Sequence, residues 1–336
     1  MPNLTIKDIA RISGCSVSTI SRVINDRPDV RPETKEHVLK VMREAGFVPN
    51  TNARQLKIQQ SRSLVFVVKG TRNLFFSDFL VQLQRAATLY GYNGIVSYLD
   101  ENANEIDAAE KILREIKPKG MIFLGGSVAN FKKGFANITV PSVLTTLVSD
   151  ELDFPNLSMV GVDDRAAAYA AVDYLIQQGH RKIAVLGGPV TSYPSVMRRE
   201  GAQQAMRDAG ILFSDKLYGL SNYDFESAYH AVNSLLARRA DFTALFAMSD
   251  VIALGAIRAL VSAGLRVPED VSVIGYDDTA LAAASLPQIT SVTHPKDIMG
   301  EDAADCLLQM LRGEIVQPRQ HLYQPKLIER QSVVRL

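Results

Sequence analysis

The sequence predicts an α/β protein with an N-terminal helix-turn-helix headpiece and a larger core of two lobes, each built on a doubly wound parallel sheet. Two short helical patterns with a tight turn between them occupy residues 5–25. From residue 63 onward, apolar runs of strand length alternate with helical stretches, and this alternation of strands and helices occurs in two successive series. The 336 residues exceed what one compact core accommodates, and they suit a small domain followed by a two-part unit.

The first two helices are predicted from caps and from apolar spacing. Thr5 caps the first helix together with Asp8 three residues later, and Gly14 supplies the turn after it. Ser16 is a fresh N-cap for a second helix that ends near Ile24. The inward faces are apolar and consist of Ile6, Ile9 and Ala10 in the first helix and Ile20, Val23 and Ile24 in the second. The pattern therefore predicts that these two helices pack on each other.

The opposite face of the second helix is predicted to contact DNA. It carries Val17, Ser18, Ser21 and Arg22. A major groove admits one helix, and an Arg bound to guanine through two hydrogen bonds is the commonest specific contact, worth roughly 1–3 kcal/mol. Val17 suits a thymine methyl group, and Ser18 suits a base edge or a phosphate. The alternative is an ordinary surface helix in a three-helix packing unit.

A third helix closes the headpiece, and a short helix-capable piece follows it. Pro32 suits a first helical position, and Gly46 ends the helix. Its apolar stripe comprises Val38, Val41, Met42 and Ala45. Residues 49–57 form barely two turns, fewer than the roughly 12–15 residues at which isolated helices become marginal in water. This piece therefore needs a partner to fold, and a plain linker is the alternative.

The remaining chain is predicted as two series of alternating strands and helices. The first series has strands at 64–68, 94–98, 121–124 and 143–146, with helices near 77–90 and 105–116. The second series has strands near 159–162, 183–186, 244–247 and 271–274, with helices near 166–178, 196–209, 225–237 and 251–263. A helix near 298–311 and short strands end the chain, and no leucine heptad tail for a tetramer follows.

Composition and charge narrow the class of protein. The net charge is +1, but residues 1–60 hold ten Lys and Arg against six Asp and Glu, so a basic head precedes a slightly acidic body. The two cysteines, Cys15 and Cys306, exclude a disulfide framework, lack metal-ligand spacing and suit small core positions. Neither a signal segment nor a membrane-length apolar run occurs. We therefore expect a cytoplasmic protein without a membrane partner, metal or cofactor.

Aromatic, charged and hydroxyl residues follow the predicted strands, and open α/β sheets bind ligands beyond the carboxyl ends of their strands. The candidate ligand-binding residues are Phe75, Phe76, Thr146, Arg198, Phe225, Ser249 and Asp277. Aromatic walls with a few charged groups suit a small polar ring that carries hydroxyl or amide groups. In the alternative interpretation, the phenylalanines are core residues, Arg198 lies on a solvated helix face and Asp277 caps a turn. His180 and His294 are interpreted as structural.

The N-terminal residues closely resemble the DNA-binding end of the lactose and galactose repressor (LacI/GalR) family of bacterial transcription regulators. The matching residues are Thr5, Asp8, Ala10, Ser16, Thr19, Ser21, Arg22, Asn25, Gly46, Pro49, Ala53 and Leu56. The resemblance continues to the C-terminus. It implies a core like that of periplasmic binding proteins, made of lobe one (about 61–161 plus 292–323) and lobe two (about 162–291 plus 324–336), after a headpiece (1–48) and a hinge helix with linker (49–60).

The resemblance also implies how the headpiece and the hinge contact DNA. In the family, the hinge helix pairs with its twin in the dimer, and a leucine, here Leu56, wedges into the minor groove. Ala53 allows close approach, Arg54 lies near phosphates, and Arg31 stands where the family usually has a hydroxyl cap. The predicted DNA-binding residues are Thr5, Ser16, Val17, Ser18, Thr19, Ser21, Arg22, Asn25, Arg31, Asn50, Ala53, Arg54 and Leu56.

The same resemblance assigns roles in the effector pocket. Residues at the positions of Arg198 and Asp277 hydrogen-bond the ligand, and those at Phe76 and Phe225 pack on it. The chain departs from the family at several further positions, which are Thr146, Ser192, Val196 and Ser249. Because these departures remove charged or amide groups, we expect a different or less polyhydroxylated ligand.

The predicted function is a transcriptional regulator, in particular a repressor that binds a pseudo-palindromic operator in double-stranded DNA as a homodimer. A small metabolite such as a sugar or sugar derivative controls it, and a nucleoside or purine is the alternative effector. A sugar- or nucleoside-processing enzyme is the alternative class, but the adjacent Asp277 and Asp278 are not a paired acid and base, and no nucleophile is evident. An exported binding protein would have no use for the headpiece.

Overall fold

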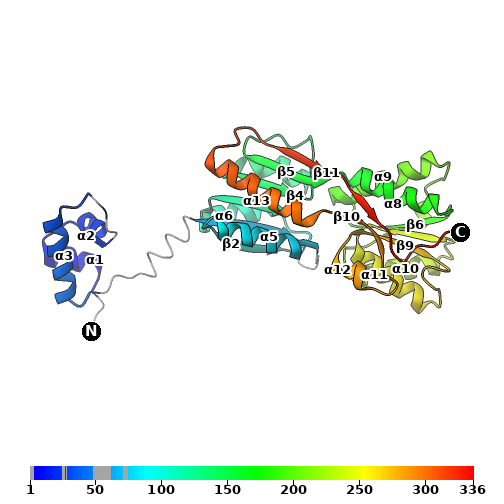
Figure 1. Ribbon diagram of the computed structural model, residues 1–336, viewed down its shortest axis with the longest axis horizontal. Coiled ribbons are helices and arrows are strands. Elements are labelled where there is room, and N and C mark those ends of the chain that lie inside the picture. The colour runs from blue at the N-terminus through cyan, green and yellow to red at the C-terminus, as the bar shows by residue number, and fades with distance from the viewer. Residues whose placement is uncertain (1–3, 25–26, 28, 48–61, 71–74) are drawn as a thin grey trace. The chain divides into compact units, whose positions relative to one another are not determined.

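The chain folds into two compact units, residues 1–59 and residues 60–336. The computed structural model describes residues 4–24, 27, 29–47, 62–70 and 75–336 (Figure 1). The first unit contains helices α1 (Ile6–Ser13), α2 (Val17–Ile24) and α3 (Pro32–Glu44). The predicted hinge, residues 49–60, lies outside the described residues.

The headpiece helices pack as their apolar spacing predicts. Ile9 of α1, Ile20 of α2 and Val38 of α3 are each fully buried in one cluster. Gly14 follows α1 in the left-handed conformation with φ of 66°, which glycine adopts without a steric cost. Arg31 precedes α3 without a side-chain cap hydrogen bond, as its lack of a short hydroxyl or carboxylate predicts. The predicted helix-turn-helix is therefore confirmed.

The second unit begins with a six-stranded sheet that forms the first lobe. All of its neighbouring strands are parallel, in the order β11-β5-β4-β3-β1-β2. The strands are β1 (Ser63–Lys69), β2 (Asn93–Leu99), β3 (Gly120–Leu124), β4 (Ser142–Thr145), β5 (Leu157–Val162) and β11 (Gln320–Tyr323). The helices of this lobe are α5 (Phe75–Leu89), α6 (Glu105–Glu115), α7 (Val128–Gly134) and α13 (Lys296–Arg312).

Both faces of the first sheet are buried, and β1 shows how. Alternate residues of a strand point to opposite faces. Phe66 therefore lies in one apolar cluster with residues of α5 and α13, and Val65 lies in another with Ile106 of α6. Helices on both faces explain why β1 is continuously apolar rather than alternating.

The second lobe repeats this architecture. Its sheet has the order β12-β10-β9-β8-β6-β7 and is parallel except where β12 pairs with β10. Its strands are β6 (Ile183–Gly187), β7 (Tyr218–Leu220), β8 (Ala244–Ala247), β9 (Ser272–Asp277), β10 (Thr290–Thr293) and β12 (Lys326–Ile328). Its helices are α8 (Asp164–Gln177), α9 (Tyr193–Asp208), α10 (Phe225–Ala237), α11 (Asp250–Ser262) and α12 (Ala280–Ala284). The chain returns to the first lobe through α13 and then, as the red segment in Figure 1 shows, runs from β11 back to the second.

Two details differ from the sequence prediction. The strand predicted at 159–162 to open the second series pairs with β4 and β11, so it belongs to the first sheet. β10 ends at Thr293 within the second sheet, so the crossover to the first lobe follows that residue. β7, β10, α7 and α12 were not predicted, because each is short and β10, TSVT, is mostly hydroxyl residues.

Candidate functional site

The outward face of α2 forms the candidate DNA interface. Val17, Ser18 and Arg22 are exposed, and Ser21 is half-buried. The backbone N–H of Thr19 donates to Oγ of Ser16 at 3.0 Å, which caps the helix as predicted. A second polar group, the hydroxyl of Ser18, lies 2.7 Å from the same oxygen.

Arg22 makes an ion pair across the surface of the headpiece. Its Nη1 atom lies 3.5 Å from Oδ2 of Asp29, and both side chains are more than half exposed. Exposed pairs of this kind contribute at most about 1 kcal/mol. The guanidinium is therefore easily redirected toward a base or a phosphate.

The other predicted DNA contacts fall into two groups. Thr5 donates from its backbone nitrogen and its hydroxyl to Oδ2 of Asp8, at 2.9 and 2.7 Å, so it fixes the start of α1. Arg31 is exposed beside α3. The remaining predicted contacts lie outside the described residues, and they are Asn25, Asn50, Ala53, Arg54 and Leu56.

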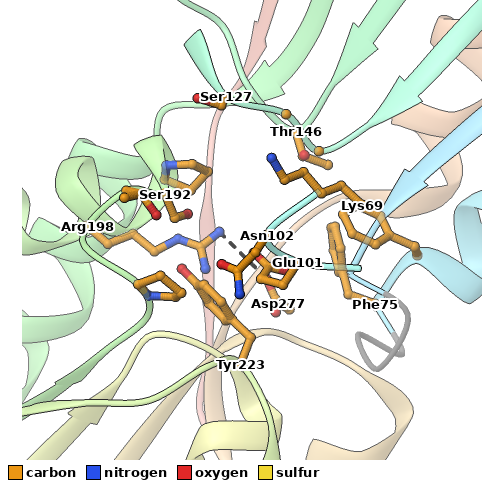
Figure 2. A pocket seen from close by; sticks show the side chains of 16 residues that line it. Lys69, Phe75, Glu101, Asn102, Ser127, Thr146, Ser192, Arg198, Tyr223 and Asp277 are labelled. Atoms are coloured by element: carbon orange, nitrogen blue, oxygen red, sulfur yellow. Dashed lines mark ion pairs between the residues drawn. The ribbon is translucent and has the colours of Figure 1, made fainter. Parts of the chain in front are cut away.

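A cavity of about 100 Å³ lies between the two lobes of the second unit (Figure 2). Figure 2 shows Lys69 extending from the first lobe toward Arg198, which extends from the second. Five predicted ligand residues line it, namely Phe75, Phe76, Thr146, Arg198 and Asp277. The structure therefore brings together residues that follow different strands, as the sheet-edge argument predicts.

Two predicted ligand residues do not line this cavity. Phe225 begins α10 as predicted, but its side chain is 43% exposed. Ser249 is buried, and its hydroxyl accepts a hydrogen bond from the backbone nitrogen of Ile252 at 3.2 Å, so it caps α11. Both residues were nominated because they follow predicted strands, and in this structure neither is among the residues that line the cavity.

Other lining residues were not predicted as ligand contacts. They include Lys69, Glu101, Asn102, Ser127, Ser192 and Tyr223. Lys69 ends β1, and Glu101 and Ser127 follow β2 and β3, so the strand-end rule could have found them. Tyr223 follows β7, a three-residue strand that the sequence pattern does not reveal.

Arg198 is held from three sides. Its Nε donates to Oδ1 of Asp164 at 2.7 Å, its Nη1 donates to the Met248 carbonyl at 2.6 Å, and its guanidinium lies 3.7 Å from the Tyr276 ring centroid. Burial opposes its charge, but Asp164 and further neighbours outweigh burial and hold the pKa of Arg198 well above its ordinary value. A fixed cation therefore faces the cavity.

Gly201, one turn after Arg198, allows this arrangement. A Cβ atom at Gly201 would lie 2.1 Å from the Arg165 carbonyl oxygen of α8. Only glycine therefore lets α9 approach α8 closely enough for Arg198 to reach Asp164.

Asp277 is the cavity carboxylate on the second lobe. Its backbone has φ of 98°, its Oδ1 lies 3.9 Å from Nη2 of Arg198, and the same oxygen lies 3.3 Å from Nδ1 of His294. Neither imidazole nitrogen of His294 makes a hydrogen bond within the described part of the chain. His180, in contrast, lies 3.0 Å from the Thr243 hydroxyl and 3.1 Å from the Val334 carbonyl through its two ring nitrogens, a structural role as predicted.

Lys69 is paired with a fully buried carboxylate behind the cavity wall. Its Nζ donates to Oε2 of Glu105 at 2.7 Å, and Glu105 also accepts from the backbone nitrogen of Ser127 at 2.6 Å. Glu101 faces the same cavity, and burial raises the pKa of its carboxyl group, with Lys69 opposing and Glu105 adding to the shift. The cavity thus has many hydrogen-bonding groups but little excess positive charge.

Neither a metal site nor a membrane span is found among the described residues. They contain no cluster of three or more His, Cys, Asp or Glu side chains able to hold a metal ion. None of their helices combines the length and apolarity that a bilayer crossing requires.

Two family models match the chain. A model of bacterial regulatory proteins of the lacI family matches residues 5–50, and a model of periplasmic binding protein-like domains matches residues 172–333. The first match covers the helix-turn-helix, and the second covers most of the second lobe together with α13.

Curated relatives match along nearly the whole chain. The HTH-type transcriptional regulator MalR of Clostridium butyricum is 35% identical over 332 residues, which covers 98% of this chain and 99% of that protein. Catabolite control protein A of Priestia megaterium is 31% identical over 317 residues, 94% of each chain. These relatives are regulators and not enzymes, which confirms the prediction that the chain is not an enzyme.

Solved structures match to the same extent. The complex of the transcriptional regulator CelR with cellobiose gives a TM-score of 0.74 at 28% identity, covering 98% of this chain and 99% of that one. The lac repressor dimer bound to operator and the anti-inducer ONPF gives a TM-score of 0.75 at 26% identity, with the same coverage.

Proposed function

The chain belongs to the lacI family of bacterial regulatory proteins, and from that premise we propose that it is a transcriptional repressor controlled by a small uncharged sugar or sugar derivative. One observation carries this proposal: residues of both lobes line one cavity in a chain that also holds an exposed recognition helix. Such a cavity can report the presence of a ligand through the relative position of the lobes. Because its target is DNA, we place the protein in the cytoplasm.

The DNA half of the proposal is supported by the surface of α2. The helix buries Ile20 and Val23 and leaves Val17, Ser18 and Arg22 exposed, which is the arrangement that major-groove contact requires. One such helix covers a half-site, so two copies of the chain would bind a pseudo-palindromic operator. The related lac repressor structure is a dimer bound to operator.

The uncharged character of the ligand is argued from the charges around the cavity. Arg198 is paired with Asp164, and Lys69 is paired with Glu105, so each cation is balanced by its own carboxylate. Asp277 lies farther from Arg198, at 3.9 Å, and the remaining Glu101 adds negative charge when ionised. A phosphorylated ligand would therefore find no uncompensated cation among the described residues that line the cavity.

Hydroxyl groups are the ligand chemistry that these side chains fit. Carboxylates accept from hydroxyls, and the cations donate to them. The lining carboxylates and cations are Lys69, Glu101, Arg198 and Asp277, and the amide of Asn102 and the hydroxyl of Thr146 can both donate and accept. The regulator CelR, a structural relative, binds cellobiose, which supports a sugar or sugar derivative here.

A nucleoside or purine is the second candidate effector. Phe75 and Phe76 of α5 line the cavity from the first lobe, and Tyr223, which follows β7, lines it from the second, so aromatic side chains are available to pack on a ring. The polar groups near Arg198 and Asp277 would then contact its ribose or its ring nitrogens.

The proposed control is a shift between two arrangements of the lobes. A ligand that contacts both lobes binds the closed arrangement more tightly than the open one. The difference between these two binding free energies is the amount by which it shifts the equilibrium toward closure. Whether closure weakens or strengthens operator binding depends on which lobe arrangement allows the two headpieces of the dimer to bind operator together. Induction and co-repression thus use the same cavity.

Isothermal titration calorimetry of the full chain tests the ligand class. Neutral mono- and disaccharides, their phosphorylated forms and nucleosides are titrated separately. We expect a neutral sugar to bind with higher affinity than its phosphorylated form. Binding of a phosphorylated sugar with equal or greater affinity would contradict the argument from charge, and binding of a nucleoside alone would support the second candidate.

A further inference from the structure

We propose that Lys296 is a positioning residue that connects the ligand-contacting turn of the second lobe to helix α5 of the first lobe. The inference rests on the proposed function, since it describes how a ligand at Asp277 is sensed by the other lobe. Lys296 is the first residue of α13, directly after the chain has crossed between the lobes. It does not line the cavity itself.

One ammonium group makes both contacts. Nζ of Lys296 donates to the backbone carbonyl of Asp278 at 3.0 Å, and it lies 3.2 Å from Oδ2 of Asp78. Asp278 follows β9 in the second lobe, whereas Asp78 lies in the first turn of α5 in the first. The side chain of Lys296 is only 12% exposed, whereas that of Asp78 is 54% exposed, so the lysine is shielded from water but the carboxylate at the first-lobe end is partly open to it.

The turn that Lys296 holds is conformationally unfavourable. Asp277 and Asp278 have φ of 98° and 48°, and both therefore lie in the left-handed region that residues other than glycine rarely adopt. Such conformations persist where neighbouring groups fix them, and they concentrate at functional sites. A ligand that engages the Asp277 carboxylate acts directly on this strained pair.

Two other contacts fix the turn from the second lobe alone. The backbone nitrogen of Asp278 donates to Oγ of Ser291 at 3.1 Å, and its Oδ1 accepts from Nη2 of Arg330 at 2.6 Å. Ser291 lies in β10 and Arg330 follows β12, so both hold the shape of the turn without reaching α5. Of these three contacts of Asp278, the one to Lys296 is the one that leads to the first lobe.

The first-lobe end of the bridge is close to the cavity. Phe75 and Phe76 begin α5 and line the cavity, and Asp78 follows two residues later. One turn farther along the same helix, the side-chain amide of Gln82 donates to Oδ1 of Asp297 at 3.2 Å. A change at the Asp277–Asp278 turn would therefore move α5 through Lys296. The contact points on α5, Asp78 and Gln82, do not line the cavity, so this path does not require the ligand to touch them.

The expected signature is a loss of coupling rather than a loss of binding. Lys296→Met keeps the unbranched side chain, shortened by one atom, and removes both polar contacts. We expect the ratio of operator affinities with and without saturating ligand to fall at least fivefold toward one, a typical size for an allosteric coupling. The dissociation constant of the ligand should change by a smaller factor than this ratio of operator affinities, because Arg198 and Asp277 still line the cavity.

Three further variants separate the bridge from a general effect on folding. Asp78→Asn removes only the negative charge that pairs with Lys296, at a half-exposed position, and should reproduce the loss of coupling. Lys296→Arg keeps a cation at this position and should retain part of the coupling that Lys296→Met loses. Lys132→Met is the matched control, since Lys132 pairs with Glu151 at 2.9 Å on the exposed surface of the first lobe, and its coupling should equal that of the wild type.

The experiment is an operator titration followed by fluorescence anisotropy, with and without saturating neutral sugar, on each full-length variant. Circular dichroism establishes that each variant is folded. Wild-type coupling in both Lys296→Met and Asp78→Asn would overturn the proposal. If the operator affinity of the wild type does not change with any ligand tested, the proposed function is refuted instead. This result is obtained before any variant is made.

Discussion

Arg198 donates from Nε to Oδ1 of Asp164 at 2.7 Å, and this contact joins α9 to α8 at the wall of the cavity. Both side chains are at least nine-tenths buried. The same Asp164 oxygen accepts from the Tyr276 hydroxyl at 2.8 Å, so one carboxylate orients both the cation and the ring beneath it. The ligand-facing side of Arg198 therefore depends on a residue that does not line the cavity.

Asp164→Asn should destabilise the protein and weaken ligand binding. Removing one partner of a buried pair leaves an uncompensated charge and typically costs about 3–5 kcal/mol. Urea unfolding measures the loss. The matched control is Glu200→Gln, which breaks the exposed pair with Arg165 and should cost less than about 1 kcal/mol. Equal stability in Asp164→Asn and wild type would show that Arg198 does not need this partner.

Arg22→Ala should relax base specificity at one position of each operator half-site, by about 1–3 kcal/mol. The reason is the exposed position of Arg22 on α2, with Ser18 one turn away. Affinities for a set of single-base operator variants measure the effect. Asp29→Asn is the control, because it removes the ion pair of Arg22 but keeps the guanidinium, and its specificity should match the wild type. A uniform loss over all operator variants in Arg22→Ala would assign the residue to a phosphate.

Glu101→Gln should make the cavity more tolerant of anionic ligands. The substitution removes one of the two carboxylates that lie outside the close pairs of Lys69 and Arg198. Calorimetry with a neutral sugar and its phosphorylated form measures the preference, which should shift toward the phosphorylated form by about tenfold, or 1.4 kcal/mol. An unchanged preference would mean that the carboxylate does not face the bound ligand.

The buried Asp250 should make stability fall between about pH 4 and pH 7. Burial, with Asp277 adding to it, raises the pKa of Asp250 from 3.8 to about 7. The folded state therefore binds this proton more tightly than the unfolded state. The resulting stability is full below about pH 4 and is lost as the pH rises through 7.

Asp250→Asn removes this titration and keeps one oxygen that can accept both hydrogen bonds from Thr279, while its amide NH2 group can donate to the Ser291 hydroxyl, which donates to Asp250 in the wild type. Relative to wild type, the free energy of unfolding of the variant should rise by about 3 kcal/mol between pH 5 and pH 8 in urea unfolding, since the two units from pH 5 to the pKa correspond to about 1.4 kcal/mol each. Asp270→Asn is the control, because the hydrogen bonds of Arg266 lower the pKa of Asp270 to about 2, so it is ionised throughout that range. Parallel pH profiles for wild type and Asp250→Asn would disprove the assignment.

The three helices of the headpiece were predictable because their signals are local. Caps at Thr5 and Ser16, the left-handed Gly14 and the apolar spacing act within a few residues of each other. The alternation of strands and helices was predictable for the same reason. The sheet to which the strand near 159–162 belongs was not, because an apolar run does not show which strands it pairs with, and its partners β4 and β11 are set by the path of the chain.

The cavity was predictable only in part. The strand-end rule found Thr146 and Asp277, whereas Lys69 was missed because a lysine at a strand end reads as a solvated residue until its buried partner Glu105 is known. Phe225 was placed at the correct helix start, but no sequence signal shows that its side chain faces solvent. Side-chain direction and pairing between distant segments are tertiary properties that periodicity does not contain.

The measurement that tests the central claim most directly is operator binding as a function of ligand concentration, for wild type and Asp277→Asn. A duplex selected from a random library by the wild-type protein serves as operator, and anisotropy reports binding. The wild type should change its operator affinity at least fivefold across the titration. Asp277→Asn should bind operator equally well without ligand but require roughly ten- to a hundredfold more ligand for the same change, the expected effect of losing a charged hydrogen bond. Identical titrations for the two proteins would contradict the claim that a ligand in this cavity controls DNA binding.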